Sequence, residues 1–177
     1  YTPLQPLTEQ ANYHFEDSSE QSFTLQKWVL RNQFCNNILH ISQAPGVNPN
    51  FWLNMVQTQA LDGVFIESLG VFNIPIEGDS SYEPIIKTAV ERNIPVLISS
   101  RYPIQPEFRT NYAPAQKAEQ LGCMIAGNMT VAAALTKFMW GLAQVKHYAH
   151  SVNQHSNLKQ LLINSYIGEI DVALESP

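Results

Sequence analysis

The stretch Gly63–Pro75, "GVFIESLGVFNIP", begins as a short apolar run and ends as a polar loop. Its first four residues are apolar, and Glu67 and Ser68 follow them. A continuous apolar run of this length, without alternation, is typical of a strand that is buried on both faces of a sheet. The stretch therefore predicts a buried strand at 63–68 whose carboxyl end leads into a loop.

Three similar runs flank this strand along the chain, and segments with helical patterns separate them. The runs are "NILHIS" at 37–42, "PVLISS" at 95–100 and "CMIAG" at 123–127. Helix signals between them include Asn48 before Pro49, Pro84 in a first turn, Pro114 at a helix start, and Thr130 as the cap of an alanine-rich helix. Apolar strands that alternate with helices favour parallel crossovers. We therefore predict an α/β fold, a Rossmann- or flavodoxin-like three-layer sandwich with a four-stranded parallel sheet.

The length and composition of the chain predict a single domain with an arm. The chain has 177 residues, 45% of them hydrophobic, which is enough for one domain with a real core. Residues 1–36, with prolines near the start, are interpreted as an arm or interdomain linker, and 37–177 as the α/β domain. Only 14% of the residues are charged, below the roughly 25% usual in globular proteins. This low fraction predicts surface hidden in a protein interface, and therefore self-association.

Charge and cysteine content argue against several classes of partner. The net charge of −5 provides no basic stripe for nucleic acid or anionic lipid, and no apolar run approaches the roughly 18 residues of a membrane span. Cys35 and Cys123 lie far apart, so we expect buried free thiols in a reducing compartment. Because the chain begins with Tyr1 and shows no leader pattern, we interpret it as part of a longer protein.

The candidate binding residues lie where the predicted strands end, because ligands of open α/β sheets bind at the carboxyl ends of the strands. Asn73 follows the strand at 63–68 on a loop that Gly70 and Pro75 restrict, and its side chain can both donate and accept hydrogen bonds. It suits recognition of an amide or carboxylate, although an asparagine here can equally satisfy turn backbone. Arg101 could bind a carboxylate or form an ordinary interface ion pair.

No catalytic or metal-binding motif can be found in the chain. The nucleophile elbow, the P-loop and the dinucleotide fingerprint are all absent from the sequence. His147, His150 and His155 are spaced for one helix face, but no carboxylate completes a metal set, and a solvated helix end is the favoured interpretation. We therefore expect no catalytic residue, metal or cofactor in this chain.

Three segments together carry a resemblance to a known family. "LDGVFIESLGVFNIP", "NIPVLISSRY" and "GCMIAGNMTVAAALTKFMWGLAQ" resemble the C-terminal domain of L-asparaginases, especially of the cytoplasmic type I branch. The resemblance runs from about residue 37 to 144, and "PLQPL" and "LKQLLINSYIGEI" are similar to the family's interdomain segment and terminal helix. It implies a two-domain cytoplasmic hydrolase that converts asparagine to aspartate and ammonia through a threonine nucleophile.

The family's catalytic motifs lie in its N-terminal domain, and this chain has none of them. Neither "TGGT" nor "GTDT" occurs, and Thr24, Thr58 and Thr130 do not stand in for the missing nucleophile. Asn73 matches the asparagine of the family's "GVGN" segment, which reaches into the active site of a neighbouring subunit. With Ser68 and Arg101, which lie at the ends of the predicted strands, we predict a substrate-binding set of Asn73, Ser68 and Arg101.

Three positions depart from the family pattern. Phe72 stands where many relatives have glycine, so a positive φ would be penalised there and the loop path is expected to differ. Asn128 replaces an aspartate, and Glu67 replaces an arginine that lies near an effector pocket in some type I enzymes. The glutamate argues against inherited regulation by asparagine.

Two functions remain open from the sequence. The first is the C-terminal domain of an L-asparaginase-type amidohydrolase, with an N-terminal catalytic domain, further copies of the same chain and a small amide substrate as partners. The second is a free-standing, non-catalytic module of the same fold that binds a small ligand or another protein. An upstream "TGGT" and "GTDT" pair would favour the first, and a start codon near Tyr1 the second.

Overall fold

In a computed structural model, the structure describes residues 30–102, 113–148 and 154–171. The chain divides into two compact units, residues 1–32 and 33–177. The second unit contains every helix and strand of the described residues. Of the first unit, only residues 30–32 fall within the described ranges.

Strands and helices alternate in the second unit. The strands are β1 (Ile38–Ser42), β2 (Gly63–Ser68), β3 (Val96–Ser100) and β4 (Met124–Ile125). The helices are α1 (Asn50–Thr58), α2 (Glu83–Glu91), α3 (Ala113–Gln120), α4 (Val131–Tyr148) and α5 (Gln154–Ile163). In the described part of the chain, no helix is both long and apolar enough to cross a bilayer.

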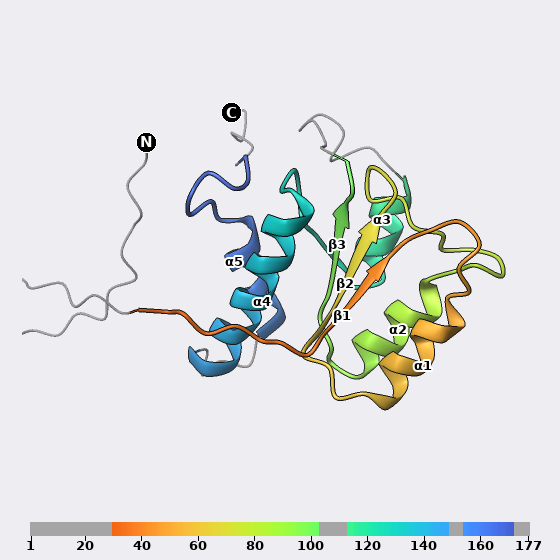
Figure 1. The fold of residues 1–177 in the computed structure, drawn as a ribbon, viewed down its shortest axis with the longest axis horizontal. Helices are drawn as coiled ribbons and strands as arrows, with labels where there is room; N and C mark the ends of the chain where they lie inside the picture. The colour runs from red at the N-terminus through yellow and green to blue at the C-terminus, as the bar shows by residue number, and fades with distance from the viewer. Residues whose placement is uncertain (1–29, 103–112, 149–153, 172–177) are drawn as a thin grey trace, which may run out of the picture. The chain divides into compact units, whose positions relative to one another are not determined.

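The four strands form one parallel sheet in the order β1-β2-β3-β4. Each of the first three helices carries the chain from one strand to its next neighbour. Connections that share one handedness and step in the same direction place their helices on the same face of the sheet. Helices α1, α2 and α3 accordingly pack on one face. Helices α4 and α5, which follow the last strand, cover the other face (Figure 1). The predicted α/β class and parallel sheet are confirmed.

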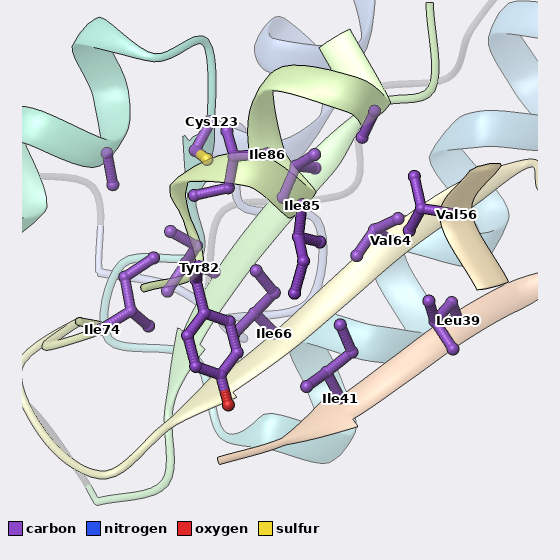
Figure 2. Close-up of a cluster of buried hydrophobic side chains, with 14 of the residues drawn as sticks. Leu39, Ile41, Val56, Val64, Ile66, Ile74, Tyr82, Ile85, Ile86 and Cys123 are labelled. Carbon is purple, nitrogen blue, oxygen red and sulfur yellow. The ribbon is translucent and has the colours of Figure 1, made fainter. Parts of the chain in front are cut away.

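Two apolar clusters hold these layers together. On the first face, residues of β1, β2 and β3 pack against α1, α2 and α3, and Figure 2 shows Ile41, Val64 and Ile66 pointing from the strands toward Val56 and Ile85 of the helices. On the second face, Phe65 and Leu97 pack against α4 and α5. Because successive strand residues point to opposite faces, the two clusters account for the unbroken apolar runs in the sequence.

Local signals mark the helix starts near the predicted positions, although α1 begins at Asn50 with Pro49 as its N-cap, one residue later than predicted. The Asn48 side chain accepts a hydrogen bond from the backbone N–H of Asn50 at 2.9 Å, at the start of α1. The Thr130 hydroxyl accepts one from the Ala133 N–H at 3.3 Å, which is the capping bond expected for α4. Strand β4 covers Met124–Ile125 and is shorter than the predicted 123–127. Gly127, which follows it, has a positive φ of 67°, so the extended backbone has ended before that residue.

Candidate functional site

The carboxyl ends of β1, β2 and β3 lie side by side because the strands are parallel and paired in register. Ser42 is paired with Glu67, and Glu67 with Ser99 on the other side. The chain leaves the sheet here through three polar segments, which begin at Gln43, Leu69 and Arg101. This edge therefore gathers the residues that the sequence singled out.

Arg101 joins all three strand ends. Its Nε donates to Oε1 of Glu67 at 2.6 Å, and its Nη2 donates to Ser42 Oγ at 2.7 Å and to the Gln43 carbonyl oxygen at 3.0 Å. A guanidinium with several oriented acceptors is held more firmly than an ordinary surface cation. Arg101 thus has internal partners in this structure.

Glu67 is the centre of this polar network. Its side chain is only 15% exposed, and its second oxygen, Oε2, lies 3.3 Å from Nε2 of His40. Burial opposes ionisation of Glu67, but the hydrogen bond and positive charge of Arg101 outweigh that effect and lower the pKa of the Glu67 carboxyl below its ordinary 4.5. Glu67, at a position where some type I enzymes were expected to have arginine, is therefore an ionised partner of Arg101.

This pairing makes a pH-dependent contribution to stability. Because the folded-state pKa of Glu67 is lowered, its contribution is fully present above about pH 4.5 and is lost as the pH falls through the folded value. We expect Glu67→Gln to lower the free energy of unfolding by about 1 kcal/mol at pH 7, and the difference from wild type to shrink as the pH falls below 4.5 and through the lowered folded-state pKa of Glu67. Urea denaturation across this pH range measures it, with the exposed Glu91→Gln on α2 as control. A Glu67→Gln difference that stays constant down to pH 3 would contradict the assignment.

Ser68 lies beside this network but points into the protein. It is fully buried, and its hydroxyl donates to the Ser99 carbonyl oxygen at 3.1 Å. Its own carbonyl oxygen accepts a hydrogen bond from the Arg101 N–H at 2.9 Å. Ser68 and Arg101 are therefore brought together, with Ser68 fastening β2 to β3 from within.

Asn73 lies further along the loop that leaves β2, at the end of a tight turn. Its N–H donates to the Gly70 carbonyl oxygen at 2.7 Å, and the two residues between them, Val71 and Phe72, have φ values of 38° and 57°. This bond and the two positive φ values are those of a type I′ turn, which usually contains Asn, Asp or Gly. The Asn73 side chain is exposed.

Phe72 adopts a positive φ of 57°, which local preference opposes in any residue with a Cβ. The left-handed conformation costs about 1–2 kcal/mol for a residue with a Cβ. Full burial of the Phe72 ring within the cluster on the α1 and α2 face offsets this cost. Packing of the ring thus stabilises a positive φ that local preference opposes. A positive φ at position 72 therefore does not require the different loop path that we expected.

Asn128 connects the turn after β4 to the end of the described chain. Its Nδ2 donates to the Asp171 carboxylate, and its Oδ1 accepts the Asp171 N–H at 3.0 Å. An aspartate at position 128 would place two carboxylates in contact. Asn128, which stands where the family has aspartate, is thus paired with Asp171 of this chain.

Neither Thr58 and Thr130 nor the two cysteines form an activated nucleophile in the structure. The Thr58 hydroxyl donates to the Asn54 carbonyl oxygen at 2.9 Å within α1, and Thr130 caps α4. Burial raises the pKa of the Cys123 thiol to about 12, and burial with the nearby Asp62 carboxylate raises that of Cys35. Thr24 lies outside the described residues.

No three His, Cys, Asp or Glu side chains gather as a metal site within residues 30–102, 113–148 and 154–171. His150 lies outside these ranges. A pocket of about 950 Å³ opens at the opposite, amino-terminal edge of the sheet, where Asp62 and Pro95 precede β2 and β3. Asp62 and Lys146 both line this pocket and form an ion pair, with Nζ of Lys146 3.2 Å from Oδ1 of Asp62. The pocket is therefore separate from the strand ends that carry Asn73 and Arg101.

The residues that sequence reasoning missed are the partners of Arg101. Ser42 and His40 were not selected, and Glu67 was noted only as a departure from the family. His40 and Ser42 are two residues apart on β1, and Glu67 of β2 is paired with Ser42. The three side chains therefore lie on the same face of the sheet. The register of the strands, which the sequence does not give, was the missing signal.

Comparison with known proteins gives consistent matches. The sequence profile of the glutaminase/asparaginase C-terminal domain matches residues 37–153. An L-asparaginase of Thermococcus kodakarensis is 34% identical over 110 residues, which cover 62% of this chain and 32% of that protein. The chain therefore spans about a third of the length of this relative.

Two solved structures share the fold. The thermostable L-asparaginase from Thermococcus kodakarensis aligns with a TM-score of 0.60 and 27% identity, over 78% of this chain and 39% of that one. L-asparaginase I from Vibrio cholerae aligns with a TM-score of 0.59 and 22% identity, over 76% of this chain and 38% of that one, which shows the fold alone.

Proposed function

The chain belongs to the glutaminase/asparaginase C-terminal domain family, and on this premise we propose that it completes the active site of an L-asparaginase-type amidohydrolase without supplying its nucleophile. The reaction is the hydrolysis of L-asparagine to L-aspartate and ammonia. The proposal includes the cytoplasmic type I assignment that the resemblance implies. In this proposal, the nucleophile and general base of the enzyme come from an N-terminal catalytic domain.

The observation that carries the proposal is the geometry of Asn73. Its side chain is exposed at the end of a tight turn, on the loop that follows the carboxyl end of β2. The carboxamide offers a donor and an acceptor, which match the polar groups of an amino-acid amide. Asn73 is accordingly the substrate-binding residue of this chain.

Ser68 and Arg101 serve the same site by fixing the strand ends. The Arg101 guanidinium connects Glu67, Ser42 and the Gln43 backbone, and the buried Ser68 hydroxyl binds the β3 backbone. Both residues hold in place the sheet edge from which the Asn73 loop departs. A substrate carboxylate near Arg101 would have to share the guanidinium with Glu67.

The proposal requires neighbouring copies of the chain, because the family's matching asparagine reaches into another subunit's active site. Large apolar side chains remain exposed on the described surface, including Phe51 at 63% and Tyr102 at 60%. Single exposed side chains are common on any protein, so it is the low charged fraction of the sequence that supports self-association.

The experiment is an ammonia-release assay on the complete gene product that contains this chain, before and after Asn73→Ala. Loss of a hydrogen bond to a polar group costs about 0.5–1.5 kcal/mol, or roughly 1.5–3 kcal/mol when the partner is charged. We therefore expect kcat/KM for L-asparagine to fall roughly two- to a hundred-fold.

The matched control is Asn54→Ala, which removes an exposed asparagine from α1 and should leave kcat/KM unchanged. An Asn73→Ala enzyme with the wild-type kcat/KM would contradict the substrate-binding role.

A further inference from the structure

The geometry points to Phe72 as the positioning residue for Asn73: its buried ring holds the turn in the left-handed form that keeps the Asn73 side chain exposed. The inference rests on the proposed role of Asn73 in substrate binding. It concerns a residue that touches no substrate and acts only through its neighbour.

Asn73 lies between two buried anchors. Phe72 is fully buried and Ile74 is 1% exposed, and both belong to the apolar cluster on the α1 and α2 face. Figure 2 shows Ile74 beside Tyr82, where the loop packs against the start of α2. With both neighbours fixed in the core, the side chain of Asn73 is directed away from it.

The backbone of the loop is fastened at both ends. At its start the Asn73 N–H closes the turn onto Gly70, and beyond Asn73 the Tyr82 N–H donates to the Pro75 carbonyl oxygen at 2.8 Å. The Ser81 hydroxyl donates to the Ile76 carbonyl oxygen at 2.7 Å. Val71 and Phe72 lie inside the turn that the Asn73 N–H closes, and their positive φ values determine the direction of Asn73.

Neither Val71 nor Phe72 favours positive φ by itself, because both have a Cβ and Val71 is β-branched. Local preference therefore pulls the turn toward other conformations, and the Phe72 ring is the part of the turn that is fully buried. Removal of the ring should release the turn and let Asn73 leave its position. Glycine at position 72 would permit the φ but would not supply the anchor.

The test is a double-mutant cycle in the complete gene product, with Phe72→Ala, Asn73→Ala and the double variant. We expect Phe72→Ala to lower kcat/KM for L-asparagine by about the same factor as Asn73→Ala, roughly two- to a hundred-fold. In the Asn73→Ala background, Phe72→Ala should have no further effect, because there is no side chain left to position. Phe72→Gly should lose as much activity as Phe72→Ala.

Two further variants separate positioning from general destabilisation. Ile85→Ala opens a cavity in the same cluster from α2, and with assays run well below its unfolding temperature it should keep the wild-type kcat/KM. Phe72→Leu keeps an apolar anchor and should lose less activity than Phe72→Ala. If Phe72→Ala fails to fold, the cycle is completed with Phe72→Leu, whose smaller loss should likewise vanish in the Asn73→Ala background.

The outcomes distinguish the two proposals. Wild-type kcat/KM in Asn73→Ala would overturn the substrate-binding role of Asn73 and the positioning role with it. A loss in Asn73→Ala combined with additive effects in the cycle would overturn only the positioning role of Phe72. An equal loss in Ile85→Ala, or full activity in Phe72→Gly, would also overturn it.

Discussion

Purified on its own, this chain is expected to release ammonia from L-asparagine no faster than the uncatalysed background. Covalent amide hydrolysis needs an activated nucleophile and a general base, and a binding loop cannot replace them. The hydroxyls of Thr58 and Thr130 serve helix α1 and the cap of α4, and the raised pKa values of both cysteines keep them as neutral thiols. Since enzymes accelerate reactions by about a million-fold or more, the complete gene product should exceed the isolated chain by at least about six orders of magnitude.

An ammonia-release assay on the isolated chain checks this expectation. The chain should be produced in a host without asparaginases of its own, because trace contamination would otherwise dominate the signal. A heat-denatured sample supplies the blank. Turnover that follows the purified chain through successive columns and scales with its concentration would contradict the missing-nucleophile argument.

Lys137→Met should destabilise the domain far more than removal of a surface charge. The Lys137 side chain is 6% exposed and that of Glu169 is 10% exposed, and Nζ lies 2.5 Å from Oε1. The same ammonium donates to the Asn164 carbonyl oxygen and lies 5.2 Å from the centre of the Tyr166 ring. The residues after α5 are thus fastened to α4 through one buried cation.

Removing that cation leaves the Glu169 carboxylate buried without its charge partner. Breaking a buried pair in this way typically costs about 3–5 kcal/mol, whereas replacing both partners is often nearly neutral. Desolvation lowers the pKa of Lys137, although the Glu169 carboxylate opposes that effect. We expect the free energy of unfolding to fall by about 3–5 kcal/mol in Lys137→Met and to recover in part in Lys137→Met with Glu169→Met.

Urea denaturation of the isolated chain measures both variants. The same substitution in an exposed pair, Lys87→Met opposite Glu83 on α2, is the matched control and should cost less than about 1 kcal/mol. A Lys137→Met chain no less stable than the Lys87→Met chain would show that the buried pair contributes nothing specific.

The sheet could be predicted from the sequence because burial on both faces leaves a plain pattern. Strand β2 has the predicted bounds, 63–68, since an apolar run with aromatic and β-branched residues is bounded there by Gly63 and a polar end. Strand β4 was predicted too long, because the positive φ of Gly127, which takes the backbone out of the extended form, is not specified by an apolar run that precedes it.

The candidate site was predictable only in outline. The position of Asn73 after a buried strand marked the right loop, but its turn type was not predictable, because Val71 and Phe72 are poor residues for positive φ and only tertiary packing places them there. The partners of Arg101 depended on the pairing of β1 with β2 and of β2 with β3, which a single sequence does not specify.

The proposed function makes this chain the non-catalytic part of an L-asparaginase. The most direct test of this function is to incubate the complete gene product with L-asparagine. Aspartate and ammonia are then quantified in the same sample. We predict sustained turnover that yields one aspartate and one ammonia for each asparagine consumed. A correctly folded complete product that releases no ammonia from L-asparagine would contradict the proposal.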